Sequence, residues 1–174
     1  MKIGLLSDTH GYLDPKVFSH FDDCDEIWHA GDIGDMVVVE ELQRFKPLRA
    51  VYGNIDDLVI QQNFPEDLRF ACEGLEVLVT HIGGTPPKYN RRTKNLFSER
   101  VPDLFICGHS HILSIKRDNN LNNMIFINPG AAGNHGFHKI KTLVRFEIVD
   151  KKISDMKVIE LGKRGELPSL KPIT

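Results

Sequence analysis

A short apolar run followed by a loop rich in glycine, aspartate and histidine recurs five times in this sequence, and few architectures accommodate that pattern. The runs occupy residues 2–6, 26–30, 49–52, 76–80 and 103–107. Their length and aliphatic or β-branched composition are typical of β-strands. Helices are predicted over residues 15–21 and 36–45, with Asp14-Pro15 and Asp35 as start signals. This order of elements predicts a parallel sheet with right-handed crossovers.

The rest of the chain is predicted to contain one more helix and a series of strands joined by short connections. A helix is predicted over residues 89–100, between Pro86-Pro87 and Pro102. Further strands are predicted over residues 114–118, 124–128, 142–149 and 152–161. The short polar connections between them are typical of hairpins. We therefore expect two mixed sheets packed face to face with helices outside, in one α/β domain that spans residues 1–174, of which 162–174 could form a loose C-terminal tail.

Composition and cysteine content argue against several classes of function and against secretion. The chain has 22 Lys and Arg against 24 Asp and Glu, a net charge of −2 that argues against binding to long nucleic acid. No apolar stretch approaches the ~18 residues of a membrane span, and the first apolar run is too short for a secretory signal. Three cysteines without a Cys-x-x-Cys pair indicate neither a disulfide framework nor a zinc ribbon. These features favour a cytoplasmic protein and leave a small anionic substrate allowed.

The loops after the five predicted strands carry side chains suited to metal binding. In chain order these side chains are Asp8, His10, Asp32, Asn54, His81, His109 and His111. Parallel strands end at one edge of a sheet, where open α/β sheets place their ligand sites, so all of these groups can converge. Converging carboxylates repel one another unless cations lie between them. The set is too large for one tetrahedral ion and suits two ions that share a carboxylate.

The order of these motifs resembles that of the calcineurin-like metallophosphoesterases. The matching motifs are Asp-x-His at residues 8–10, Gly-Asp-x-x-Asp at 31–35, Gly-Asn-x-Asp at 53–56, His81, and Gly-His-x-His at 108–111. The compact length and the Ile-Asn-Pro-Gly segment at 127–130 are most similar to the small bacterial and archaeal YfcE-like phosphodiesterases. The resemblance covers residues 2 to about 160 and implies a four-layer αββα sandwich.

The resemblance also implies how the ligands are shared. The first metal ion would be held by Asp8, His10 and His111; Asp32 would bridge to the second, and Asn54, His81 and His109 would complete that second site. Mn²⁺ is the expected metal, although mixed imidazole, carboxylate and amide ligands also suit Zn²⁺, Fe, Co²⁺ and Ni²⁺. A hydroxide bridging the two ions would attack phosphorus. The expected activity is a phosphodiesterase for small diesters, nucleotide-derived diesters included.

One position departs from the family pattern. Many members carry a histidine after the asparagine of the third motif, close to the leaving group, whereas Ile55 stands there and cannot donate a proton. The YfcE-like group resembles this sequence in lacking that histidine. We assign Asn54 and Asp56 as candidate catalytic residues. Asp56 could relay a proton through water or, in the favoured interpretation, orient Asn54.

Several alternatives stay open. The enzyme could be a phosphomonoesterase, or the chain could be a non-catalytic scaffold, because the vacuolar sorting subunit of retromer resembles this fold. His29 could support Asp32 or simply pack in the core, and the cation-rich run 88–94 could bind phosphate or form a solvated helix face. His135 and His138 receive no role. The chain could also form a homo-oligomer.

Overall fold

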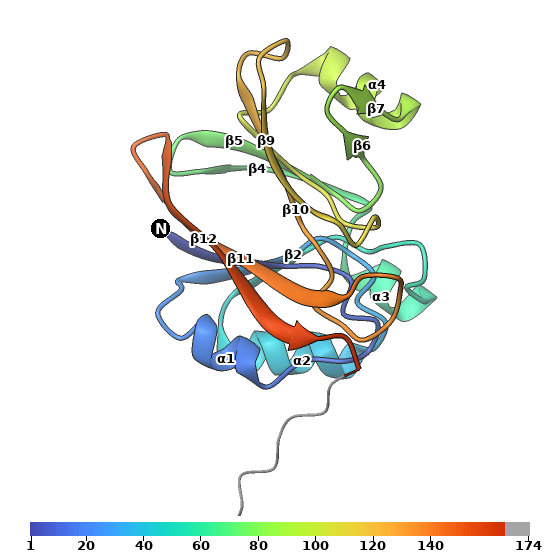
Figure 1. Cartoon of the computed structure of the whole chain (residues 1–174). Helices are drawn as coiled ribbons and strands as arrows, with labels where there is room; N and C mark the ends of the chain where they lie inside the picture. The colour runs from blue at the N-terminus through green and yellow to red at the C-terminus, as the bar shows by residue number, and fades with distance from the viewer. Residues whose placement is uncertain (166–174) are drawn as a thin grey trace, which may run out of the picture.

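Two five-stranded mixed sheets pack face to face in the computed structural model, which describes residues 1–165 (Figure 1). The first sheet has the order β12-β11-β1-β2-β3. Its strands are Lys2–Leu6 (β1), Glu26–His29 (β2), Leu48–Ala50 (β3), Ile140–Val149 (β11) and Lys152–Lys163 (β12). Strands β1, β2 and β3 run parallel, as predicted. Strands β11 and β12 form an antiparallel hairpin, and β11 pairs antiparallel with β1.

The second sheet has the order β4-β5-β8-β10-β9. Its strands are Asp67–Cys72 (β4), Leu75–Thr80 (β5), Leu104–Ile106 (β8), Leu113–Asp118 (β9) and Met124–Pro129 (β10). The three central strands are parallel, and the two edge strands are antiparallel to their neighbours. A two-stranded hairpin of Gly84–Thr85 (β6) and Lys88–Tyr89 (β7) lies beside this sheet (Figure 1).

Helices cover both outer faces, so the chain forms the expected four-layer αββα sandwich. The first sheet is covered by Lys16–His20 (α1), Met36–Phe45 (α2) and Leu58–Asn63 (α3), and the second by Arg91–Glu99 (α4) (Figure 1). Asp35 caps α2 as predicted, because its side chain accepts a hydrogen bond from the N–H of Val37. Among residues 1–165, none of the helices has both the length and the apolar character that a bilayer span requires.

The main core lies between the two sheets. Alternate residues of the strands face inward, and all of β1, β2, β5, β8, β10 and β11 contribute buried aliphatic or aromatic side chains. Trp28 is completely buried there and packs edge to face against Phe70 and Phe146. Burial of this apolar surface holds the two sheets together and fixes the strand ends that carry the polar loops.

Four elements were not predicted from the sequence: α3, β4, β6 and β7. Strand β4 and helix α3 lie in the segment 58–72, where six-residue elements with mixed polarity give a weak periodic signal. The prediction of a helix from residue 89 was wrong at its start, because Tyr89 belongs to β7 and α4 begins at Arg91. The predicted tail is also shorter at its beginning, since β12 continues to Lys163; residues 166–174 lie outside the described part of the chain.

Candidate metal centre

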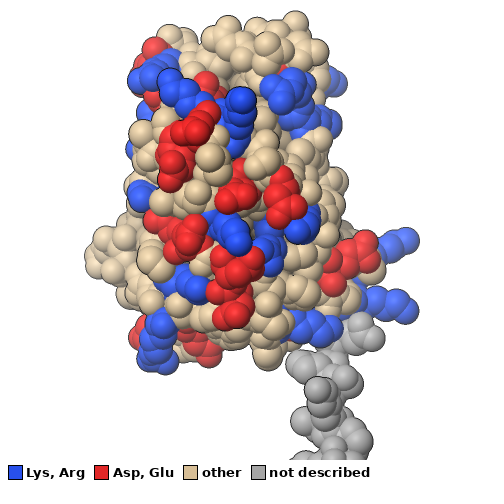
Figure 2. All heavy atoms as spheres, turned by 90° about the vertical axis from the view of Figure 1, so that its left-hand side faces the viewer, with Lys and Arg blue, Asp and Glu red and all other residues tan. Residues whose placement is uncertain are grey.

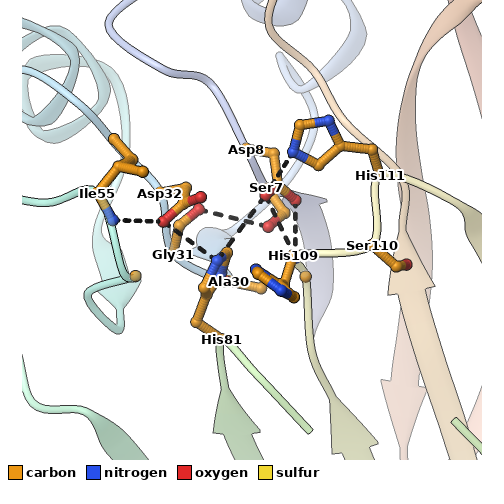
Figure 3. Close-up of polar contacts among 12 residues, drawn as sticks. Ser7, Asp8, Ala30, Gly31, Asp32, Ile55, His81, His109, Ser110 and His111 are labelled. Atoms are coloured by element: carbon orange, nitrogen blue, oxygen red, sulfur yellow. Dashed lines mark hydrogen bonds and ion pairs between the residues drawn. The ribbon is translucent and has the colours of Figure 1, made fainter. Parts of the chain in front are cut away.

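The loops after β1, β2, β5 and β8 meet at one edge of the sandwich and bring most of the predicted ligands together (Figure 3). These loops contribute Asp8 and His10, Asp32, His81, and His109 and His111, respectively. Asp8 and Asp32 are buried, which removes both carboxylates from bulk water. Two groups of side chains form within this cluster.

One group consists of Asp8, His10, Asp32 and His111, whose ligand atoms all lie within 4.8 Å of one another. Nε2 of His111 lies 3.2 Å from Oδ1 of Asp8 and 3.2 Å from Nε2 of His10. Nε2 of His10 lies 3.7 Å from Oδ2 of Asp32. Two imidazole nitrogens and two carboxylates therefore face a common point, an arrangement that suits a divalent transition-metal ion.

The other group consists of Asp32, His81 and His109, again within 4.8 Å of one another. Nε2 of His81 lies 3.1 Å from Oδ1 of Asp32. The rings of His81 and His109 meet edge to face with their centroids 5.3 Å apart. Asp32 thus presents one carboxylate oxygen to each group, which is the geometry of a residue able to bridge two cations.

His81 shows that these residues suit a cation. Its Nδ1 lies 2.8 Å from the carbonyl oxygen of Ala30, which can only accept, so the ring proton is assigned to Nδ1. Nε2 is then an acceptor, and it is buried without an aligned hydrogen-bond partner among the described residues. A buried acceptor that faces the Asp32 carboxylate is unfavourable unless a proton or a metal ion lies between them.

The charges in the cluster shift its protonation equilibria. Burial disfavours the charged imidazolium of His81, but the adjoining carboxylates of Asp32 and Asp8 outweigh burial and raise the pKa of His81. Burial also opposes ionisation of Asp32, yet contacts with His81 and with the backbone N–H of Ile55 lower the pKa of Asp32. For His10 burial dominates and lowers the pKa, which favours the neutral imidazole that binds metals.

The backbone of the candidate ligands is strained. Left-handed φ angles occur at Asp8 (55°), His10 (49°), Asp32 (52°), His109 (66°) and His111 (57°). Such conformations cost non-glycine residues about 1–3 kcal/mol each and persist only where the surroundings enforce them. The N–H of His109 donates to both carboxylate oxygens of Asp8 at 3.2 Å, which is one such constraint. Left-handed backbone also occurs at turns elsewhere in the chain, but here five such residues carry side chains that face one region, which is typical of a functional site.

Two glycines allow the loops to approach this closely. A Cβ at Gly53 would lie 2.1 Å from Oδ1 of Asp32, too close for any real side chain. Gly31 has a φ of +92°, and a Cβ there would lie 2.6 Å from Nδ1 of His81. Any larger residue at either position would displace a candidate ligand.

Asp56 connects the loop after β2 with the loop after β3 through hydrogen bonds to backbone amides. Its carboxylate accepts hydrogen bonds from the backbone N–H groups of Ile33 at 3.2 Å, Gly34 at 2.7 Å and Gly53 at 2.7 Å. These contacts join the loop after β2 to the loop after β3. Both carboxylate oxygens are thus occupied by amides, while the orientation of Asn54 by Asp56 and the proton relay both stay predictions.

His29 supports the same region and is not among the side chains that face the cluster. The N–H of Gly31 donates to its Nδ1 at 3.2 Å, so its proton is assigned to Nε2, which donates to Oγ1 of Thr9 at 2.9 Å. Thr9 in turn donates to the carbonyl of Ile33 at 2.9 Å. Complete burial lowers the pKa of His29 to about 3. A neutral His29 therefore helps to fix the loop that carries Asp32.

Asn54 and Ile55 lie at the rim of the cluster. Asn54 is exposed and lines a small cavity of about 80 Å³ together with His81 and Arg92. It is thus next to the second group, and its role as a ligand or catalytic residue stays a prediction. The backbone N–H of Ile55 donates to Oδ1 of Asp32 at 3.1 Å (Figure 3), while its side chain is 46% exposed and offers no polar atom.

Three residues without a definite role in the sequence analysis lie near the cluster. The ring of His135 lies 5.0 Å from that of His10, and the ring of His138 lies 5.3 Å from that of His111. Arg92, in the cation-rich run, forms ion pairs with the carboxylates of Glu66 and Asp67 and is not a freely solvated cation. Its two partners are distant in sequence, so no local signal could have revealed them.

Comparison with known proteins identifies the family. Residues 1–151 match the calcineurin-like phosphoesterase superfamily domain. Two archaeal proteins described as probable metallophosphoesterases are similar to this chain. The protein from Methanothermobacter thermautotrophicus is 31% identical over 136 residues, which cover 75% of this chain and 77% of the relative. The protein from Methanocaldococcus jannaschii is 31% identical over 137 residues, which cover 75% and 68%. The chain therefore belongs to the calcineurin-like phosphoesterase superfamily of metal-dependent hydrolases, as the motif order indicated.

Solved structures share the fold. A structure described as a novel archaeal phosphodiesterase superimposes with a TM-score of 0.74 and 22% identity over 92% of this chain and 100% of the other. Zinc-complexed Vps29 from Entamoeba histolytica gives a TM-score of 0.72 and 16% identity over 92% and 98%. At these identities the similarity concerns the architecture alone, and the side chains of this chain must decide between activities.

Proposed function

We propose that this chain is a phosphodiesterase that hydrolyses small phosphodiesters with the help of two divalent transition-metal ions, Mn²⁺ foremost. The position of Asp32, with one carboxylate oxygen facing each group of ligands, is the observation that carries the proposal. When bound, the two ions supply an activated water at neutral pH and positive charge for the phosphoryl oxygens. The family and the phosphodiesterase neighbour support this class of reaction.

The charges of the site favour an anionic substrate once two cations are bound. Asp8 and Asp32 together carry two negative charges, so two divalent cations leave the centre positive, and a phosphodiester monoanion is attracted. Without cations, the same buried carboxylates would repel phosphate. The exposed amide of Asn54 is positioned at the rim, where it can donate a hydrogen bond to a phosphoryl oxygen.

We also propose that the substrate is small and that the protein acts in the cytoplasm. The side of the molecule that carries the N-terminus shows basic and acidic side chains intermingled (Figure 2). This face offers no continuous positive surface for long nucleic acid, and the net charge of −2 favours a small substrate for the molecule as a whole. The cysteines Cys24, Cys72 and Cys107 are buried and unpaired, which is compatible with a reducing compartment.

Metal removal tests the proposal. We expect a chelator such as EDTA to abolish hydrolysis of bis(p-nitrophenyl) phosphate and added Mn²⁺ to restore it, because the nucleophile depends on the bound ions. The metal content of the same samples should follow the activity. Undiminished hydrolysis by protein shown to contain no metal would contradict the proposal.

Two alternatives differ from it in measurable ways. A phosphomonoesterase would hydrolyse p-nitrophenyl phosphate faster than bis(p-nitrophenyl) phosphate, whereas we expect the diester to be preferred. A scaffold protein would hydrolyse neither ester. The fold similarity to Vps29, solved as a zinc complex, is the observation behind this second alternative, so hydrolysis and not metal binding alone decides between the two.

A further inference from the structure

A groove of about 470 Å³ begins beside His109 and runs away from the candidate metal centre along the outer face of the second sheet. Its floor is formed by β9 and β10, where Ser114 pairs with Asn128 and Lys116 pairs with Phe126. Helix α4 packs on the same face farther along, through Phe97 against Phe105 of β8. The β9–β10 end of the sheet is therefore the part that the groove occupies.

The walls of the groove are largely apolar. The β6–β7 hairpin forms one side, and Tyr89 from this hairpin donates its hydroxyl to Asp118 at 2.7 Å, so its polar end is already used. Ile82 and Ile112 flank the opening and are 38% and 67% exposed. Apolar side chains left in water at the edge of a concave site are typical of a binding surface for an organic group.

The end of the groove next to the metal centre is held rigidly. Nδ2 of Asn128 donates to the carbonyl of Gly108 at 2.7 Å and to Oγ of Ser110 at 3.1 Å, and its Oδ1 accepts from the N–H of Gly130 at 3.0 Å. The buried Asn128 thus fixes the loop that carries His109 relative to the floor of the groove. A ligand in the groove would consequently have a defined position relative to the phosphoryl site.

The other end of the groove is positively charged. Lys88 and Lys116 line it, both are exposed, and neither has an acidic partner within ion-pair distance among residues 1–165. Within the described part of the chain, no aspartate or glutamate lines the groove. Lys116 follows Ser114 by two residues of extended strand, which places it roughly 7 Å farther from the metal centre. Unpaired ammonium groups beyond an apolar channel favour a ligand with a distal anion.

We propose that this groove binds one arm of the phosphodiester substrate, and that this arm carries a nucleoside-sized planar group followed by a second phosphate, which Lys88 and Lys116 bind. The inference rests on the proposed phosphodiesterase function and names the substrate class for it. The volume falls within the range of sites that enclose small organic ligands. The planar group lies between the hairpin and Phe126, and the scissile phosphate lies beside His109.

Two substrates that differ only in the second phosphate test the inference. They are thymidine 5′-(p-nitrophenyl phosphate) and the same compound with a phosphate on the 3′-oxygen. Release of p-nitrophenol gives kcat/KM for each. We expect the 3′-phosphate to raise kcat/KM about tenfold, because a charge-assisted hydrogen bond contributes free energy of that size. The ratio should fall toward one in the variants Lys116→Ala and Lys88→Ala.

Lys152→Ala provides the matched control, since Lys152 is exposed on β12 and lines no part of the groove. This variant should keep the full preference for the 3′-phosphate. A wild-type protein that does not distinguish the two substrates would overturn the inference. So would a preference that survives in both groove variants, because the second phosphate would then be bound outside the groove.

Binding of thymidine 3′-phosphate to chelator-treated protein gives a readout independent of catalysis. Calorimetry should show about tenfold weaker binding to Lys116→Ala than to Lys152→Ala. Diester hydrolysis without any such binding or preference would refute the groove assignment and leave the proposed function standing. Binding that depends on Lys116 in a protein that hydrolyses no diester would support the groove assignment and refute the proposed function.

Discussion

Asp32 is the residue on which both halves of the candidate metal centre depend. It is 2% exposed, has a left-handed φ of 52° and contacts His10 through one oxygen and His81 through the other. Its neighbour Gly53 must lack a Cβ for this arrangement to exist. A local sequence motif is sufficient to predict that such an aspartate binds a metal ion. Its position between two groups of ligands, however, depends on loops that are far apart in the chain.

Replacement of Asp32 by asparagine tests its bridging role. We expect Asp32→Asn to lose at least one of two bound Mn²⁺ ions and to hydrolyse bis(p-nitrophenyl) phosphate at least ~100-fold more slowly, since a bound cation contributes several kcal/mol of charge stabilisation. Elemental analysis and initial rates measure the two effects. Asp35→Asn is the control, because asparagine caps helices as well as aspartate does. Full metal occupancy in Asp32→Asn would rule out the bridge.

The side chain of Ile55 predicts slow hydrolysis of diesters that have poor leaving groups. Its side chain offers no proton to a leaving group, and that lack matters most when the leaving group is a poor one. We expect Ile55→His to accelerate hydrolysis of diesters with alkyl or nucleoside leaving groups by roughly 10²-fold or more, and of p-nitrophenyl diesters much less.

Leu58→His is the matched control for this substitution, since Leu58 is 72% exposed and lies three residues farther along the same segment. Rates for the two classes of diester should change little in that variant. Equal acceleration of both classes by Ile55→His would show that the histidine acts by some means other than protonation of the leaving group.

The loops after β2 and β3 act as a unit because Asp56 binds three of their backbone amides. In Asp56→Asn, the new NH₂ group must face at least one of these N–H donors, so a hydrogen bond is lost. We expect a decrease of about 1–3 kcal/mol in the free energy of unfolding and roughly 10–100-fold weaker metal binding. Urea denaturation and metal titration measure these quantities.

The neighbouring substitution Asp57→Asn separates this effect from a general loss of charge. Asp57 caps α3 by accepting from the N–H of Ile60 at 3.0 Å, and asparagine preserves such a cap. Its metal affinity should match that of the wild type. If both variants weakened metal binding to the same extent, the loop contacts of Asp56 would not be the cause.

The predicted elements differ in how strongly the sequence specifies them. The central strands β1, β2, β5 and β8 are short apolar runs bounded by glycine or histidine, so they were located from sequence alone. Strand β4 is an edge strand of mixed exposure, stabilised by its pairing with β5 and by the packing of Leu68 and Phe70 against the main core. The β6–β7 hairpin has two residues in each strand and depends in the same way on tertiary contacts.

A buried ion pair joins two segments that lie far apart in the sequence. Nζ of Lys141 on β11 donates to Oδ2 of Asp14 at 2.7 Å and lies 5.0 Å from the ring centre of Tyr12. Lys141 is 1% exposed and Asp14 is 4% exposed. The sequence suggested only a helix start at Asp14, and its carboxylate does accept from the N–H of Lys16 at 3.0 Å. The lysine partner lies 127 residues away and could not be predicted locally.

Loss of this pair should destabilise the whole molecule. We expect Asp14→Asn to lower the free energy of unfolding by about 3–5 kcal/mol at pH 7, because the Lys141 ammonium is left buried without its counter-charge. Asp22→Asn, at an exposed aspartate, should have little effect. Urea denaturation of the three proteins measures the difference. A loss below about 1 kcal/mol would show that water or another group solvates Lys141.

The same pair makes stability depend on pH. Burial alone would raise the pKa of Asp14, but the hydrogen bonds from Lys141 and from the Lys16 amide outweigh it and lower the pKa of Asp14. The native state therefore prefers the ionised carboxylate. Its contribution should be complete above the ordinary aspartate pKa of about 3.9 and should disappear as the pH falls through the lowered pKa. A stability difference between wild type and Asp14→Asn that stays constant down to that range would contradict this account.

The sequence by itself determined the alternation of strands and helices, the class of sandwich and the identity of the polar residues at the strand ends, because these features depend on local periodicity and on short motifs. Tertiary structure alone decided that Asp32 faces two groups of ligands, that Asp56 is occupied by backbone amides and that Lys88 and Lys116 share a groove. These outcomes require the packing of two sheets and the approach of loops distant in the chain, which no local pattern encodes.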